Sequence, residues 1–131
     1  MVLIAYVTGE EPVASLVAPL LEDLDLIVVV SAISLTEVVT RPARAGDRGR
    51  VDAIAAALTA LPRLQFVEFD RRHALEAAFV RGQTDLKLPD AAIIVTARLA
   101  NAIAIIGNDR HWRNKPLGVP YHQMDDILAL P

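Results

Sequence analysis

Short apolar runs alternate with longer segments of helical periodicity, and this alternation limits the possible folds more than any other feature of the chain. The clearest apolar runs cover residues 26–30 and 103–106, and a further short strand is expected at 65–69. Strands that are apolar on successive residues are covered on both faces, as in parallel sheets between helices. The sequence therefore predicts an α/β fold with a mainly parallel sheet, whose functional sites lie at the carboxyl ends of strands.

Helical segments are expected between these strands. Apolar spacing predicts helices over residues 12–22, 31–45 and 50–61, a helix from Asp70 to Gly82, and another that opens at Pro89. Asp70 is a good helix cap, and Gly82 is a common stop signal. In the helix after Asp70, the apolar stripe is read as Ala74, Leu75, Ala78 and Phe79. A short helical turn after Asp109, a strand near Tyr121 and a last turn over 126–130 complete the expected order.

The composition is that of one globular domain spanning residues 1–131. Hydrophobic residues make up 53% of the chain and charged residues 22%, which excludes a disordered protein. The chain has no Cys, so it has no disulfide, no thiolate metal site and no Cys nucleophile. This usage fits a reducing cytoplasm. With 13 Lys and Arg against 16 Asp and Glu, the chain is not a wholly basic protein that coats nucleic acid.

No membrane span or signal peptide is expected, although the mean hydropathy is high at +0.38. The most apolar stretch, residues 91–107, contains Thr96, Arg98 and Asn101 and so fails as a spanning helix. The N-terminus has no basic residue before its first apolar run. The excess of apolar side chains instead predicts buried strands and a homodimer interface.

Three acidic residues occupy positions where α/β folds place their sites. Asp109 follows the strand that ends at 106, Asp90 lies in the first turn of a helix, and Glu37 lies about two turns beyond the strand that ends at 30. If they converge, they form an oxygen-rich pocket of negative charge. Mg²⁺ or Mn²⁺ prefers such ligands, and a bound ion can activate water for phosphodiester cleavage.

Each acid taken singly also has a simpler explanation. Ser34 and Glu37 have the spacing of a capping box, so Glu37 could only close a helix start. Asp90, next to Pro89, could only complement a helix dipole. Asp109 could be a turn or N-cap residue. The residues alone therefore leave the metal site as one of two open alternatives.

Three segments resemble motifs of PIN-domain ribonucleases. Residues 31–42 (SAISLTEVVTRP) are similar to the second motif of that family, residues 86–91 (LKLPDA) to the third, and residues 105–112 (IIGNDRHW) to the fourth. The order of the motifs resembles that in the VapC toxins of type II toxin–antitoxin modules. So do the total length and the separations of 53 residues from Glu37 to Asp90 and 19 from Asp90 to Asp109.

The resemblance implies a fold and an activity. It implies a three-layer α/β/α architecture and a metal-dependent endoribonuclease in which a metal-activated water attacks an RNA phosphodiester. By the same resemblance, Glu37, Asp90 and Asp109 are the catalytic acids that hold Mg²⁺ or Mn²⁺, with Thr36 nearby. A cognate antitoxin protein is the implied partner and inhibitor.

The chain departs from the family pattern at two places. The family begins with an apolar strand that ends in a catalytic Asp, and Met1 falls just after that point. The leading explanation is a start codon placed too late. The other is a true truncation, in which residues 2–7 form a substitute strand, or the chain is an incomplete module that binds antitoxin or itself without cleaving RNA. The second departure is Gly107, where the family usually has Thr or Ser, so a hydroxyl near the site is expected to be missing.

Basic residues flank two of the acids. Arg41 and Arg44 follow Glu37, and Arg110 and Arg113 follow Asp109. If they border the acidic pocket, they can hold RNA phosphates. An antitoxin contact or a solvated charged surface explains them equally well.

The remaining polar and aromatic candidates are given structural roles. His73 and His122 are expected at the surface, and Trp112 and Tyr121 are expected to pack rather than to stack on bases. His111 could assist proton transfer, although a carboxylate metal site needs no His base. A small metal-dependent phosphatase ranks last, because it would need a nucleophilic Asp at the end of the first strand.

Overall fold

Two pairs of parallel strands organise the part of the chain that the computed structural model describes, residues 27–107 and 109–123. The first pair is β1 (Val28–Ser31) with β2 (Leu64–Val67), and the second is β3 (Ile105–Gly107) with β4 (Tyr121–Gln123). The predicted parallel pairing is therefore confirmed. Within the described residues, however, the two pairs form separate two-stranded sheets, where the sequence suggested one sheet.

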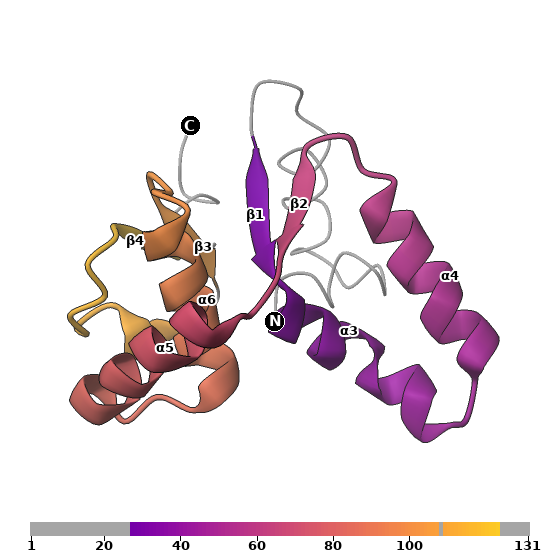
Figure 1. Cartoon of the computed structure of the whole chain (residues 1–131), viewed down its shortest axis with the longest axis horizontal. Coiled ribbons are helices and arrows are strands. Elements are labelled where there is room, and N and C mark those ends of the chain that lie inside the picture. The colour runs from indigo at the N-terminus through magenta and orange to yellow at the C-terminus, as the bar shows by residue number, and fades with distance from the viewer. Residues whose placement is uncertain (1–26, 108, 124–131) are drawn as a thin grey trace.

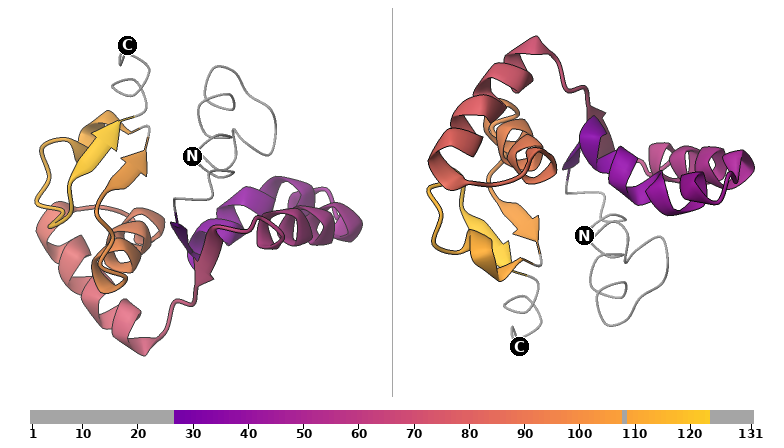
Figure 2. Two further views of the ribbon diagram at one scale, coloured as in Figure 1. Left: turned by 90° about the horizontal axis from the view of Figure 1, so that it is seen from above. Right: turned by 90° about the horizontal axis from the view of Figure 1, so that it is seen from below.

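Helices connect the strands in the predicted order. α3 (Ala32–Arg44) and α4 (Arg48–Thr59) join β1 to β2, and α5 (Arg71–Thr84) and α6 (Leu88–Leu99) join β2 to β3. A 3-10 turn, η1 (Arg110–Trp112), follows β3. In Figure 1, β1 and β2 lie between the α3–α4 hairpin and the remaining elements. Both views of Figure 2 show α3 and α4 running side by side away from the strands.

Helix starts follow the capping residues that the sequence offers. The Ser31 hydroxyl accepts the N–H of Ile33 and begins α3, and the Asp70 carboxylate accepts the N–H of His73 and begins α5. α4 begins two residues earlier than expected, because Asp47 caps it by accepting the N–H of Arg50 at 2.9 Å. Local hydrogen bonds thus fix where the helices enter the fold.

The main core surrounds α6, which packs against α5, α3 and β1. Ala91, Ala92 and Ile94 of this helix are fully buried. Trp112 packs into the same core, as predicted. The cluster consists of Ala77, Val80, Leu86, Ala91, Ile94, Val95, Ala97, Ile105, Trp112 and Leu117. Helix α6 therefore shares this core with Ile105 of β3 and also contacts β1 of the other strand pair.

The predicted apolar stripe of α5 is wrong. All four of its members are exposed, and the side chains of Leu75 and Phe79 are 58% and 67% accessible. The buried face carries Ala77 and Val80 together with the polar residues His73 and Thr84. Gly82 also does not stop the helix, which runs to Thr84. The packing of α6, and not the apolar content of α5 alone, selects the buried face.

His73 is buried, which corrects its assignment to the surface. Its Nδ1 lies 2.7 Å from the Asp70 carboxylate, and its ring contacts Phe69 with centroids 5.9 Å apart. The hydrogen bond from the His73 side chain is the main cause that lowers the pKa of Asp70. His122 is exposed, as predicted. The Asp70–His73 pair closes the start of α5.

Most other elements differ from the prediction only at their boundaries, but the third apolar run is not the buried strand that was predicted, because Ile106 of β3 is 40% exposed. The third apolar run begins as a strand at Ile105, and Ile103 before it lies in a bend with an 88% exposed side chain. The elements expected over residues 2–7, 12–22 and 126–130 lie outside the described residues. Among the helices that the structure describes, none is both long and apolar enough to cross a bilayer.

Candidate active site

Asp90 lies in the first turn of α6, where the sequence placed it. Pro89 sits at the start of this helix, and the N-cap residue Lys87 makes no side-chain capping bond. The Asp90 side chain is half-buried. Burial raises its pKa, the charge of Asp109 raises it further, and the positive charge of Lys87 opposes both. A second carboxylate thus shares the environment of Asp90.

Asp109 lies just past the carboxyl end of β3. It is exposed, and its Oδ1 accepts the N–H of His111 at 2.8 Å, so it caps the turn η1. The simpler reading of Asp109 as an N-cap is therefore confirmed. Capping the turn does not exclude that Asp109 also binds a metal ion, because a carboxylate has several acceptor sites. Its charge acts on Asp90 from the neighbouring element.

Of the three predicted acids, Asp90 at the helix start and Asp109 past the strand end are therefore near enough for the charge of one to raise the pKa of the other, Asp90. A divalent cation would relieve the cost of ionising Asp90 next to the charge of Asp109. The donor set consists of hard carboxylate oxygens and so fits Mg²⁺ or Mn²⁺. Asp90 and Asp109 are the residues of this pair that could hold such an ion.

Glu37 is half-buried on α3, a helix that contacts α6. The capping-box reading of Glu37 is wrong, because Ser31 is the N-cap of α3 and Ser34 lies inside the helix. Thr36 is exposed on the same helix. Across residues 27–107 and 109–123, no group of three acidic or His side chains is close enough to hold a metal ion. Glu37 as a third ligand stays a prediction.

The predicted basic residues divide into two groups. Arg110 and Arg113 are exposed in and just after η1, next to Asp109. Arg41 and Arg44 are exposed in the last turn of α3, where positive charge also complements the helix dipole. His111 is exposed and donates its backbone N–H to Asp109.

Tyr121 is a residue of this region that sequence reasoning treated only as packing. Its hydroxyl accepts the N–H of Asp109 at 3.1 Å and donates to the carbonyl of Asp109 at 2.8 Å. Its ring also packs on Trp112, with centroids 5.5 Å apart, so the packing role is present too. A hydroxyl thus does lie beside Asp109, although Gly107 carries none. The small residue at 107 was the one sequence signal of this contact.

Comparison with known proteins shows the family. The family model described as the PIN domain matches residues 1–116. The chain belongs to the PIN domain family. PIN domains are generally nucleases. No protein with curated annotation matches this PIN domain.

A solved structure shows the same fold. The complex of VapBC2 from Rickettsia felis bound to a DNA fragment from their promoter contains a chain that matches this PIN domain with a TM-score of 0.68. The match has 13% sequence identity and covers 93% of this chain and 92% of that chain. The α/β PIN-like architecture that the motifs implied is therefore confirmed.

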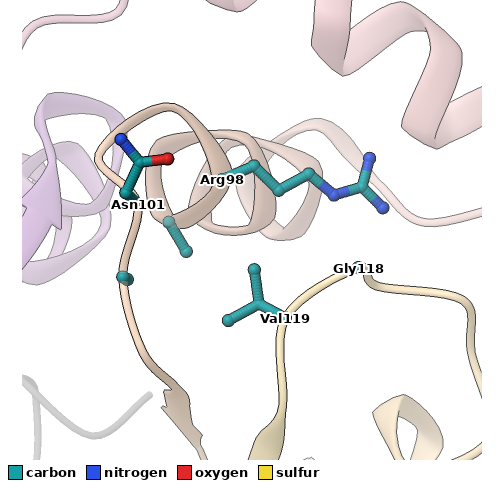
Figure 3. A pocket seen from close by; sticks show the side chains of 6 residues that line it. Arg98, Asn101, Gly118 and Val119 are labelled. Carbon is teal, nitrogen blue, oxygen red and sulfur yellow. The ribbon is translucent and has the colours of Figure 1, made fainter.

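A pocket of about 290 Å³ in this PIN domain lies between the carboxyl end of α6 and the loop before β4 (Figure 3). Arg98 lines it near the carboxyl end of α6, whereas Asp90 is in the first turn of that helix. The guanidinium of Arg98 donates to the carbonyls of Pro116 and Leu117. Arg98 therefore fastens the loop before β4 and is not a candidate ligand residue.

Proposed function

We propose that this PIN domain is a metal-dependent endoribonuclease toxin that cleaves RNA phosphodiesters in the cytoplasm. The observation that carries the proposal is the Asp90–Asp109 pair, in which burial and the second carboxylate raise the pKa of Asp90. The PIN family membership and the fold shared with a VapBC2 chain support it. Asp90, Asp109 and Glu37 would hold Mg²⁺ or Mn²⁺.

The chain's own residues have separate roles in this proposal. Asp90 and Asp109 supply oxygen ligands from two elements that the core holds fixed. Arg110 and Arg113, beside Asp109, attract the RNA phosphates, and Arg41 and Arg44 extend this attraction along α3. When bound, the divalent ion supplies an activated water and neutralises charge at the phosphate. Asp90 must be ionised for this role, and a bound cation lowers the raised pKa that burial gives it.

The experiment is RNA cleavage in the presence of Mg²⁺ or Mn²⁺. The native chain is compared with Asp90→Asn and Asp109→Asn, with EDTA as the metal-free control. Asp52→Asn is the matched control, because Asp52 is an exposed carboxylate of α4 paired with Arg48. We expect cleavage that requires the metal, Asp90 and Asp109 but not Asp52. Loss of at least about a hundredfold in rate is expected for each site variant, since removing a ligand disables the metal's chemistry.

One alternative function has an observation in its favour. Because the described residues contain no group of three side chains that could hold a metal ion, the chain could be a module that binds a partner without cutting RNA. In that case a folded chain shows no cleavage with either metal ion. That outcome overturns the nuclease proposal for this chain.

A cognate antitoxin protein and a second copy of the chain are the proposed partners. The VapBC2 neighbour is solved as a complex, which supports the first. Exposed large apolar side chains support the second; among the described residues they are Ile27, Leu75, Phe79, Leu88, Ile103 and Ile106. Light scattering at micromolar concentration tests the homodimer, and a monomer mass would contradict it.

A further inference from the structure

One hydroxyl holds both main-chain polar groups of Asp109. Tyr121 begins β4 and pairs in parallel register with Ile105 of β3. From there its hydroxyl reaches Asp109, the second residue past the end of β3, accepting one hydrogen bond from the N–H of Asp109 and donating one to its carbonyl, at 3.1 and 2.8 Å. These two bonds oppose rotation of the peptide units on both sides of the Asp109 Cα.

The hydroxyl is itself held in place. The Tyr121 ring packs against Trp112, whose side chain is 4% exposed and belongs to the main core. Trp112 also ends the turn that Asp109 caps. The core therefore supports the tyrosine, and the tyrosine supports Asp109.

Gly107 provides the space for this arrangement. A Cβ atom built on Gly107 would lie 2.9 Å from the Tyr121 hydroxyl oxygen and 3.0 Å from its Cε2 atom. Contacts this short are not tolerated, so any larger residue at 107 must displace the ring or its hydroxyl. The glycine is needed for space and not for a positive φ, because its φ is not among the positive values.

We propose that Tyr121 is a positioning residue for Asp109: its hydroxyl, admitted by Gly107, fixes the main chain of Asp109 and so holds its carboxylate beside Asp90 for a divalent cation. The inference rests on the proposed function, because it assigns Asp109 to a metal site. An exposed carboxylate on an unsupported turn would lose orientational freedom when it binds an ion. The two hydrogen bonds of the Tyr121 hydroxyl restrict Asp109 before the ion binds, so less orientational freedom is lost on binding. Groups outside the ligand shell have this effect in metal sites.

The test is a titration of the full chain with Mn²⁺ alone, in which the free ion is followed by electron paramagnetic resonance. Tyr121→Phe keeps the ring on Trp112 and removes only the hydroxyl. We expect its Kd for Mn²⁺ to rise about tenfold, the size typical of changes just outside a ligand shell. Thr59→Val is the matched control, because it also removes a hydroxyl that donates to a main-chain carbonyl, at 2.8 Å on α4. Its Kd should not change.

A second variant changes Gly107, the other residue of the contact with Tyr121. Gly107→Ala leaves Tyr121 intact but displaces its hydroxyl, so it should weaken Mn²⁺ binding as Tyr121→Phe does. Excess Mn²⁺ should restore RNA cleavage by both variants, which a general loss of structure would not allow. Native Mn²⁺ affinity in either variant, when folded, overturns the inference.

Asp90→Asn separates this inference from the proposed function. If Asp90→Asn weakens Mn²⁺ binding and Tyr121→Phe does not, the metal site stands and the positioning role of Tyr121 is wrong. If Asp90→Asn binds Mn²⁺ like the native chain, the metal site itself is wrong and the inference falls with it.

Discussion

At the scale of single residues, Asp90 is the clearest sign of function. Burial, and after it the charge of Asp109, raises its pKa, so the folded chain disfavours the ionised form of this carboxyl group. A residue chosen only for stability at this position would not be a half-buried acid next to another acid. An acid whose charge is disfavoured in this way is a candidate functional residue, which agrees with the metal site proposed above.

The first prediction follows from this shift. Because the pKa of Asp90 lies above its ordinary value of 3.8 in the folded chain, the unfolded chain releases this proton at lower pH. Stability contributed by the residue is therefore lost as the pH rises from the unfolded to the folded pKa. Without divalent ions, Asp90→Asn should gain in Tm relative to the native chain as the pH rises from below 3.8 to neutral. Thermal unfolding in EDTA measures this, and a pH-independent difference would contradict it.

The second prediction concerns Gly107. Gly107→Ala should lower the free energy of unfolding by about 1–3 kcal/mol, as overpacking does in well-packed sites. In the Tyr121→Phe background the cost should be smaller, because the 2.9 Å contact with the hydroxyl oxygen is gone. Urea unfolding of the four chains in this cycle gives the coupling between the two residues. If the changes in the free energy of unfolding of the two single variants add up to that of the double variant, the residue at 107 does not clash with the Tyr121 hydroxyl.

At the scale of elements, α6 determines the position of the candidate site, because it carries Asp90 in its first turn and is buried on several sides. Alanines let its neighbours come close, and both Ala91 and Ala92 have no exposed surface. The helix contacts α5, α3 and β1, so its position determines where the first turn and its carboxylate lie. The site depends on this packing.

The third prediction tests that packing. Ala92→Leu should lower the free energy of unfolding by about 1–3 kcal/mol, because the larger side chain has no space. Ala100→Leu adds the same side chain at the exposed end of the helix and should change stability by less than about 0.5 kcal/mol. Urea titrations compare the two variants. Equal losses in the free energy of unfolding for the two variants would mean that the packing around Ala92 does not restrict the size of its side chain.

Most of the helices and strands could be predicted from the sequence, and the predictions that were wrong have physical causes. Element order and helix starts follow local signals such as Asp70 and Pro89, which act within one turn. The buried face of α5 was missed because its apolar residues surround the helix, and α6 selects the face. His73 was missed because it lies on the same buried face of α5 as Ala77 and Val80, and that face was not predicted.

The candidate site was predictable to the same extent. Asp90 lies in the first turn of a helix and Asp109 just past a strand end, where parallel α/β folds place their sites, so both positions follow from the general geometry of such folds. The hydrogen bonds between Tyr121 and Asp109 could not be predicted, because they depend on the register of β4 with β3. Twelve residues separate Tyr121 from Asp109, and no local pattern reports that register.

At the scale of the whole molecule, the described chain has a dense part and an extended part. The main core gathers α5, α6, β3 and η1, whereas α3 and α4 project from the β1–β2 pair as a hairpin (Figures 1 and 2). α4 buries only Ile54 and Leu58. The two parts meet where α6 contacts β1 and α3.

The fourth prediction is unequal protection of these parts. Amides of α6 should exchange with solvent only through global unfolding, because the helix lies at the centre of the core. Amides of α4 should exchange faster, through local opening that leaves α6 intact. Native-state hydrogen exchange measures both helices in one experiment. Equal protection of α4 and α6 would show that the hairpin unfolds only together with the core.

The close contact between Gly107 and Tyr121 also restricts how this protein can change over generations. A mutation that adds a side chain at 107 is harmful while the tyrosine remains, and loss of the tyrosine is harmful while Asp109 relies on it. The two positions should therefore change in pairs among relatives. Where residue 107 carries a side chain, the residue that aligns with Tyr121 is expected to be smaller, with another hydroxyl group near the aspartate.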